Sequence, residues 1–491
     1  MPEAIVIGAG FAGLSASCFL ARAGWNVTLL EKNNQPGGRA QQWQSKGFSF
    51  DMGPSWYWMP DVFERFFQQF GKSVNDYYSL TRLDPSYHIL WQDGIMPVPA
   101  GAESLAQLFE SIEPGSAQAL EKFLSEAQFK YKIGMEKLVY KPGLSITEYI
   151  DKDLLAGLFR LDVFTPMRNH VHAHFRDPKL RLLMEFPVIF LGAMADKIPA
   201  LYSLMNYADI VGGTWYPQGG IYSVVKAMHS LALELGVRFH FGEEVTGLEI
   251  HPAAKNTISV VHTSKNRYKA DAVIGAADYH HIETQLLPKQ YQTYSSDYWN
   301  SRVMAPGCLL FYLGLNKKIP GIGHHTLFFD TDFEAHAKAI YENPSWPEDP
   351  LFYMCCPSVT DPTVAPPGSE NLFLLVPLAA GLEENDPHMR ERYLQKLVDR
   401  IEKYTGIKIR DSIILQRSFA HREFISEYHS FKGNAYGLAN TLKQTAILKP
   451  SCKSKKLRNL YYAGQLTVPG PGVPPSLISG ELAARELIRN F

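Results

Sequence analysis

A glycine-rich segment close to the first residue separates a predicted strand from a predicted helix. The apolar, β-prone run covers residues 4–7, and the segment of helical composition covers residues 14–23. Between them lie three glycines with the spacing G-x-G-x-x-G: Gly8, Gly10 and Gly13. A second apolar run ends in Glu31, 18 residues after Gly13. This order of elements is typical of a βαβ unit that binds a dinucleotide.

Each glycine has its own physical task in such a unit. Gly8 permits the tight turn, Gly10 lets the backbone approach a pyrophosphate, and Gly13 lets the helix pack closely against the strand. The pyrophosphate lies at the positive end of the helix dipole. Glu31 accepts hydrogen bonds from ribose hydroxyls, and its charge disfavours a 2′-phosphate, so NADP is not expected. The neighbouring residues that we assign to the same site are Phe11, Ala12 and Lys32.

Size and composition limit the class of protein. With 491 residues, the chain is too long for one simple core, and 46% hydrophobic and 20% charged residues are ordinary for a globular protein. The formal net charge of -1 gives no basic field, so we expect no nucleic-acid partner. The five cysteines fit neither a disulfide framework nor a zinc site, which indicates a reducing compartment.

Two charge-free runs, residues 4–21 and 459–480, are long enough to raise the question of a membrane span. The first contains the glycine turn, and the second contains four prolines that a continuous helix would not tolerate. We therefore expect no membrane-spanning helix. Because the first predicted strand begins at residue 4, we also expect no cleaved leader.

One glycine fingerprint predicts one dinucleotide, and the simplest interpretation is a tightly bound FAD without an NAD site. A second glycine cluster, residues 36–39, offers backbone N–H groups and a permanent positive charge near the phosphates, although an ordinary surface turn is the alternative. An aromatic-rich loop, residues 50–60, suits contact with a flat isoalloxazine ring or a long apolar substrate. The alternative is that these residues belong to the hydrophobic core. The cofactor residues that we assign here are Gly38, Arg39, Gly53, Pro54 and Ser55.

The order of predicted elements indicates interleaved domains. A mainly helical stretch, residues 100–205, precedes several predicted strands, and the last of these, residues 460–464, must complete the sheet that begins at residue 4. We therefore predict an α/β fold in which a Rossmann-type FAD-binding domain is interleaved with a mixed-sheet substrate domain and a helical, membrane-facing region. The predicted bounds are 1–75, 215–300 and 440–491 for the FAD-binding domain, 76–139 and 301–439 for the substrate domain, and 140–214 for the helical region.

These segments resemble the bacterial carotenoid desaturases, the phytoene desaturases of the flavin amine-oxidase-like superfamily, over nearly the whole chain. The nucleotide motifs are shared by the whole superfamily. More specific to carotenoid desaturases are Trp-Tyr-Pro-Gln-Gly-Gly at residues 215–220, Ser-Val-Thr-Asp-Pro-Thr at 358–363 and the proline- and glycine-rich segment at 463–475.

The resemblance implies non-covalent FAD and a long polyene substrate in an apolar tunnel. It implies that the backbone of Val245 meets adenine and that the C-terminal segment lies along the ribityl chain and the ring. The residues of that segment are Gly464, Gln465, Gly472, Val473 and Pro474. Many superfamily members have an acid at the position of Gln465, so this chain departs from the pattern there. The final helix, predicted at residues 477–489, would point its N-terminus at the flavin.

The implied activity is that of a phytoene desaturase, which introduces double bonds stepwise into phytoene to give lycopene. A hydride passes to FAD from an allylic carbon, a base takes the proton, and a quinone or oxygen reoxidises the flavin. Glu148 lies near an acidic position of relatives and is the candidate proton acceptor, with a solvated helix-surface glutamate as the alternative. The enzymes that remain open as alternatives are a C30 diapophytoene desaturase, a hydroxycarotenoid 3,4-desaturase and a carotenoid isomerase. A non-enzymatic alternative is a prenyl-lipid carrier, because the Rab GDP dissociation inhibitors share this fold.

A membrane surface is the expected partner, since the substrate lives in lipid. Residues 186–195 and 198–208 are apolar but too short to span a bilayer. They suit either a helical entrance lying in a membrane surface or a buried helix pair below the tunnel. We expect a cytoplasmic protein that associates peripherally with the membrane.

Three histidine groups raise the question of a metal. His170 and His174 share one helix face, but no nearby cysteine or glutamate pair completes a ligand set, so we expect a polar face and no metal. The adjacent pairs at residues 280–281 and 324–325 carry no ligand spacing either.

Overall fold

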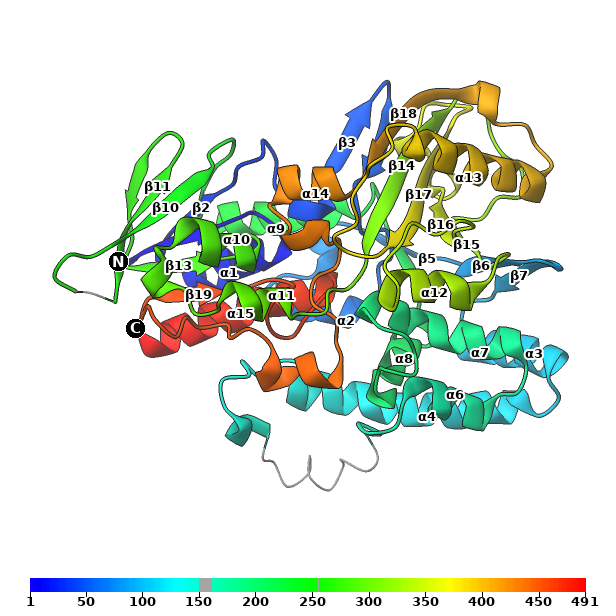
Figure 1. Ribbon diagram of the computed structural model, residues 1–491, viewed down its shortest axis with the longest axis horizontal. Helices are drawn as coiled ribbons and strands as arrows, with labels where there is room; N and C mark the ends of the chain where they lie inside the picture. The colour runs from blue at the N-terminus through cyan, green and yellow to red at the C-terminus, as the bar shows by residue number, and fades with distance from the viewer. Residues whose placement is uncertain (150–160, 255) are drawn as a thin grey trace.

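A five-stranded parallel sheet forms one half of the molecule (Figure 1). The computed structural model describes residues 1–149, 161–254 and 256–491. The strand order is β19-β13-β1-β2-β9, and the bounds are β19 Leu460–Tyr462, β13 Ala272–Gly275, β1 Glu3–Ile7, β2 Asn26–Leu30 and β9 Arg238–His240. The chain thus returns to its first sheet near its end, which confirms the predicted interleaving.

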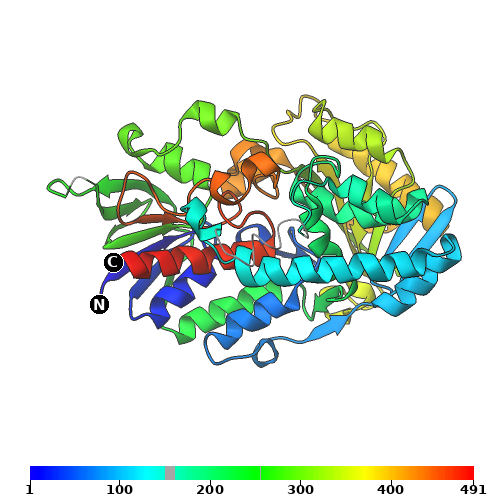
Figure 2. The same ribbon diagram turned by 90° about the horizontal axis from the view of Figure 1, so that it is seen from below.

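Helices cover one face of this sheet, and a small antiparallel sheet covers the other. α1 (Phe11–Arg22) lies between α9 (Tyr222–Glu234) and α15 (Val473–Asn490), and Figure 2 shows α1 and α15 side by side. At their crossing, a Cβ on Gly480 would lie 2.1 Å from the carbonyl oxygen of Ala12, so the close approach requires glycine. The antiparallel sheet on the other face consists of β10 (Val245–Ile250), β11 (Ile258–Thr263) and β12 (Arg267–Lys269).

A seven-stranded mixed sheet forms the second half of the molecule. Its order is β18-β14-β17-β16-β15-β6-β7, antiparallel except where β15 pairs with β6. The bounds are β18 Ile413–Phe419, β14 Gly307–Leu315, β17 Glu370–Leu378, β16 Phe352–Cys355, β15 His325–Phe328, β6 Tyr87–Trp91 and β7 Gly94–Val98. α13 (Met389–Thr405) packs apolar side chains on one face of this sheet, and the helical region covers the other.

The helical region lies below the second sheet in Figure 1. Its elements are α3 (Ala102–Ile112), α4 (Ser116–Ile133), η4 (Ile146–Tyr149), α6 (Met167–His174), α7 (Pro178–Glu185), η5 (Phe186–Leu191), η6 (Ala200–Ser203) and α8 (Leu204–Ile210). In the apolar runs at residues 186–195 and 198–208, for which the sequence left open a membrane face or a buried helix pair, the buried side chains include Phe186, Val188 and Ile198. This burial favours the alternative of helices packed below the cavity.

Shorter elements connect these layers. They are β3 (Gln42–Ser45), β4 (Phe48–Asp51), α2 (Pro60–Gln68), β5 (Leu80–Arg82), β8 (Trp215–Pro217), α10 (Tyr279–His281), α11 (Ser296–Asn300), α12 (Phe333–Tyr341) and α14 (His421–Tyr428). Among the helices of the described ranges, none combines the length and the apolar character that crossing a membrane requires.

Candidate functional site

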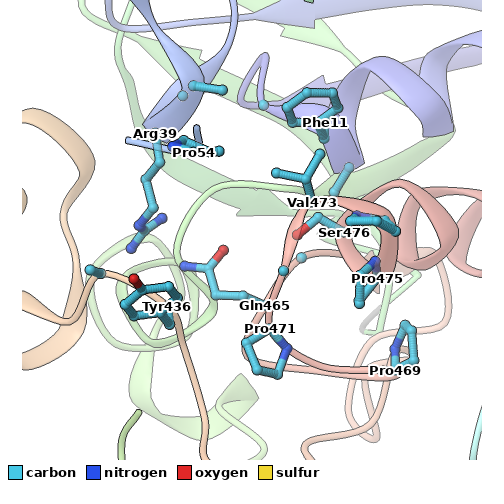
Figure 3. A pocket seen from close by; sticks show the side chains of 18 of the residues that line it. Phe11, Arg39, Pro54, Tyr436, Gln465, Pro469, Pro471, Val473, Pro475 and Ser476 are labelled. Carbon is cyan, nitrogen blue, oxygen red and sulfur yellow. The ribbon is translucent and has the colours of Figure 1, made fainter. Parts of the chain in front are cut away.

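A cavity of about 860 Å³ lies between the two sheets, and the residues predicted to bind a cofactor line it. Of the residues assigned to the cofactor, Gly13 alone does not reach its wall. Figure 3 shows part of the lining, in which the side chains of Arg39 and Gln465 face each other. Segments from both ends of the sequence therefore meet at one site.

The three glycines of the first turn have the surroundings that a dinucleotide site requires. Gly8 has a φ of +100°, and a Cβ there would lie 3.0 Å from the backbone nitrogen of Ala277. A Cβ on Gly13 would lie 1.9 Å from the carbonyl oxygen of Gly8. A Cβ on Gly10 would meet nothing within 4 Å. The backbone at Gly10 therefore borders open space at the N-terminus of α1, where a pyrophosphate fits.

The end of β2 holds the acid predicted to meet a ribose. Glu31 is buried, and its two carboxylate oxygens accept backbone N–H bonds from Ala9 at 2.8 Å and from Asn33 at 2.9 Å. Burial raises the pKa of Glu31, which these two hydrogen bonds oppose. Val245 and Lys32 line the same end of the cavity, and Lys32 Nζ donates to the carbonyl oxygen of Ser426 at 2.6 Å. This end fits the adenosine part of FAD.

Arg39 is half-buried and lines the cavity wall. Its guanidinium donates to Ser430 Oγ at 3.0 Å. The carboxamide oxygen of Gln465, in the orientation that satisfies both groups, accepts from both terminal nitrogens of Arg39 at 2.7 and 2.9 Å. Burial lowers the pKa of Arg39, and the negative charge of Asp278 opposes this effect. Gln465 is thus held by the arginine of the second glycine cluster.

Two further observations indicate that FAD fits this wall. The Nε of Arg39 is buried and has no hydrogen-bond partner among the described residues, so a donor is left for a ligand. Gly472, Val473 and Pro474 line the cavity where α15 begins, which brings the positive end of an 18-residue helix to it. These residues would hold the flavin half of FAD.

The remainder of the cavity is apolar. Aliphatic side chains and aromatic rings make up most of its wall away from the glycine turn. They include Trp56, Trp58, Met135, Leu138, Val139, Leu191, Leu201, Met205, Leu310, Tyr353, Leu375 and Tyr436. Such a wall suits a hydrocarbon ligand, because burying apolar surface contributes about 25 cal/mol of binding free energy per Å².

Glu148, the candidate proton acceptor, does not line the cavity. Its carboxylate accepts backbone N–H bonds from Gly143 and Leu144, both at 2.9 Å, and from Ser145 at 3.0 Å. These bonds hold the turn that leads into η4. The placement favours a structural role for this glutamate.

The histidines of α6 have an acidic neighbour that spacing along the sequence did not reveal. Glu126 and Asp162 lie beside His170, with Glu126 Oε2 3.6 Å from the imidazole. Lys130 Nζ lies in the same group, 2.9 Å from Asp162 and 3.5 Å from His170 Nε2. A lysine cation at this position disfavours a metal ion.

Lys449 supports a prediction on stability. Its Nζ is buried without a partner among the described residues, and burial lowers its pKa from 10.5 to about 7. Below pH 7 the folded protein buries a charged ammonium group, which lowers the free energy of unfolding. Between pH 7 and 10.5 the folded protein holds the neutral amine, so this loss of stability shrinks as the pH rises. We expect Lys449→Met to stabilise the fold by on the order of 4 kcal/mol at pH 6 and by little near pH 10.5.

Urea unfolding at both pH values measures this effect, with Lys456→Met as the control because Lys456 is exposed. An equal gain in the free energy of unfolding at both pH values would contradict the assignment of a buried lysine charge.

Comparisons with known proteins agree with the geometry. Residues 11–488 match the family of flavin containing amine oxidoreductases. The chain is 42% identical over 491 residues to a carotenoid 3,4-desaturase of Haloarcula japonica, covering 100% of this chain and 98% of the relative. It is 31% identical over 492 residues to a zeta-carotene-forming phytoene desaturase of Myxococcus xanthus, covering 99% and 93%.

A solved oxidoreductase from Methanosarcina mazei has the same fold, with a TM-score of 0.62 at 15% identity, covering 98% of this chain and 99% of that one. The match to a flavin oxidoreductase family argues against a carrier without redox chemistry. The chain therefore belongs to the flavin containing amine oxidoreductases, among the carotenoid desaturases, and its cofactor is FAD.

Proposed function

We propose that this protein desaturates the C3–C4 bond near the end of a long carotenoid. The observation that carries the proposal is the identity of 42% over the full length of both chains with a relative of that name. The apolar half of the cavity supports a hydrocarbon substrate, because its wall offers aliphatic and aromatic surface close to the cofactor half.

When bound, FAD supplies a two-electron acceptor that takes a hydride from an allylic carbon. The side chains of this protein bind the polyene, orient it and exclude water. Trp56, Trp58 and Tyr436 line the cavity with flat surfaces that suit a conjugated chain. A quinone or oxygen would reoxidise the cofactor.

A second candidate is the phytoene desaturase that forms lycopene. Its support is the identity of 31% with a phytoene desaturase that forms zeta-carotene. The two candidates differ in the substrate they accept, since phytoene is colourless and saturated at several positions, whereas a 3,4-desaturase acts on an already conjugated chain.

The test supplies the purified protein with FAD, a quinone and liposomes that carry one carotenoid at a time. One sample contains phytoene, and the other contains a conjugated carotenoid with a saturated C3–C4 bond. We expect the conjugated substrate to gain one double bond, which chromatography and a red shift of its absorption detect. Conversion of phytoene alone would favour the second candidate, and conversion of neither would overturn both.

We also propose that the protein takes its substrate from a membrane surface. Exposed apolar side chains flank the cavity-lining residues Ile146, Val163 and Ala446. The exposed fractions are 63% for Ile146, 85% for Phe164 and 50% for Leu448. For residues 186–195 and 198–208 the sequence left open a membrane face or a buried helix pair, and the described apolar side chains of these runs are largely buried.

Introducing a charge at this rim is expected to weaken membrane binding. Leu448→Asp should lower the fraction of protein that sediments with liposomes about tenfold, because a carboxylate would be moved toward hydrocarbon. Leu233→Asp is the matched control, since Leu233 is 51% exposed but lies on α9, which covers the first sheet. Equal losses for the two variants would contradict the placement.

A further inference from the structure

Two buried histidines lie behind the wall of the cavity, where β15 begins, and the chemistry described above does not use them. The Nδ1 of His325 lies 2.6 Å from the hydroxyl of Tyr353, which lies 2.9 Å from Ser55 Oγ. Tyr353 and Ser55 both line the cavity. A continuous chain of hydrogen bonds therefore leads from the cavity to His325, whose ring is stacked on Trp56 with 4.2 Å between centroids.

The second histidine continues this chain toward the surface. His324 Nδ1 lies 2.7 Å from Oγ1 of Thr360, a half-buried residue. One ring nitrogen of His324 and one of His325 lie within 4.8 Å of each other, and the Nε2 atom of each ring is buried without a partner among the described residues. One water molecule between the two rings would give both Nε2 atoms a hydrogen-bond partner.

The surroundings of His324 come from residues 215–220 and 358–363, two of the three segments that are more specific to carotenoid desaturases. The ring of Tyr216 lies 4.8 Å from that of His324. One carboxylate oxygen of Asp361 accepts from the Tyr216 hydroxyl at 3.0 Å and from the N–H of Gly219 at 2.8 Å. Segments more than 140 residues apart in the sequence are thus joined beside this histidine.

The charges around the pair favour movement of a proton outward. Burial lowers the pKa of His324 to about 3 and that of His325 well below its ordinary value. Asp361 opposes the effect at His324, whereas a charge on His324 lowers the pKa of His325 further. A positive charge is therefore less unfavourable on the outer ring.

We propose that Ser55, Tyr353, His325, His324 and Thr360 form a path by which the proton released in desaturation leaves the cavity. The path rests on the proposed function, because desaturation removes one hydride and one proton from the substrate. The apolar part of the cavity wall has few side chains that can accept this proton, and the Ser55 and Tyr353 hydroxyls begin a path through it.

The steps of the transfer balance. After the hydride has left, the adjacent C–H bond breaks, and its electron pair forms the new double bond. The proton passes to Oγ of Ser55, whose own proton moves to the oxygen of Tyr353, and the Tyr353 proton moves to Nδ1 of His325. The Nε2 proton of His325 then passes to the bridging water, which gives one of its protons to Nε2 of His324. His324 releases its Nδ1 proton to the hydroxyl of Thr360, which passes its own proton to solvent. A neutral imidazole of low pKa can still accept this proton, because the allylic cation that remains after hydride loss is a very strong acid.

The same two histidines and Cys355 have the donor types of a zinc site, but the protonated state of the thiol argues against one. Burial raises the pKa of the Cys355 thiol to about 12, whereas a metal ligand would be a thiolate.

Kinetic measurements on FAD-loaded variants test the path. Tyr353→Phe and His324→Gln should slow anaerobic reduction of the flavin by the carotenoid about 10²-fold. FAD content and carotenoid affinity should stay at the wild-type values, and the solvent deuterium isotope effect should change. Tyr393→Phe is the matched control, because this buried tyrosine bonds to the carbonyl oxygen of Pro347 on the α13 side of the sheet. Wild-type rates in both path variants would overturn the proposal.

Nitrogen NMR of the histidines gives a readout that does not depend on turnover. In the FAD-loaded protein without substrate, Tyr353→Phe should shift the Nδ1 resonance of His325, and Tyr393→Phe should not. If the wild-type protein converts no carotenoid, the proposed function fails, and this measurement alone decides on the path. An unchanged His325 resonance in Tyr353→Phe would then overturn it.

Discussion

Gly10→Asp is expected to abolish FAD binding while the protein stays folded. The backbone at Gly10 is compatible with any L-residue, with φ −73° and ψ 178°, and a Cβ there meets nothing within 4 Å. The new carboxylate would therefore project into the space reserved for the pyrophosphate and repel it. We expect the Kd for FAD to rise at least about 100-fold, which corresponds to about 2.7 kcal/mol.

Titration of the apoprotein with FAD, followed by flavin fluorescence, measures this change. Gly247→Asp is the matched control, because a Cβ at Gly247 also meets nothing within 4 Å and this residue does not line the cavity. A Gly10→Asp variant that is folded and binds FAD with wild-type affinity would disprove the location of the pyrophosphate.

Gly13→Ala is expected to destabilise the fold, although it adds one methyl group. The new Cβ would lie 1.9 Å from the carbonyl oxygen of Gly8 and 3.3 Å from the Cβ of Ala276, so α1 would have to move away from β1. Because backbone atoms cannot yield as a flexible side chain does, we expect a loss of about 3 kcal/mol in the free energy of unfolding.

The same substitution at Gly10 is the control for this effect. Gly10→Ala adds its methyl group to open space, so its unfolding midpoint in urea should stay close to that of the wild type. Equal midpoints for Gly13→Ala and Gly10→Ala in the absence of FAD would show that the turn does not hold α1 as closely as described.

Local sequence patterns predicted the first sheet well. β1 and β2 are apolar runs beside an obligatory glycine turn, and the short apolar run that forms β19 could only complete the same buried sheet. The residues that we predicted to bind the cofactor come from both chain ends, and all but Gly13 line one cavity, because each belongs to a motif with a fixed backbone geometry. Their contact with FAD stays a prediction.

Pairings between distant side chains were not accessible in the same way. Gln465 pairs with Arg39, which is more than 400 residues away in the sequence. Glu148 accepts backbone N–H bonds in a local turn that the sequence around it did not indicate. The pair at residues 324–325 looked unremarkable because the partners of these histidines, Tyr353 and Thr360, come from β16 and the loop after it. Apolar composition alone could not separate a buried helix from a membrane face at residues 186–208.

We propose that one cavity holds FAD beside a carotenoid and that electrons pass from the carotenoid to the flavin. Anaerobic mixing of the FAD-loaded protein with a conjugated carotenoid that has a saturated C3–C4 bond tests it most directly. We predict that one flavin is bleached for each double bond formed, as measured by absorbance and by chromatography of the extracted carotenoid. A flavin that stays oxidised while the carotenoid is bound and unchanged would contradict the claim.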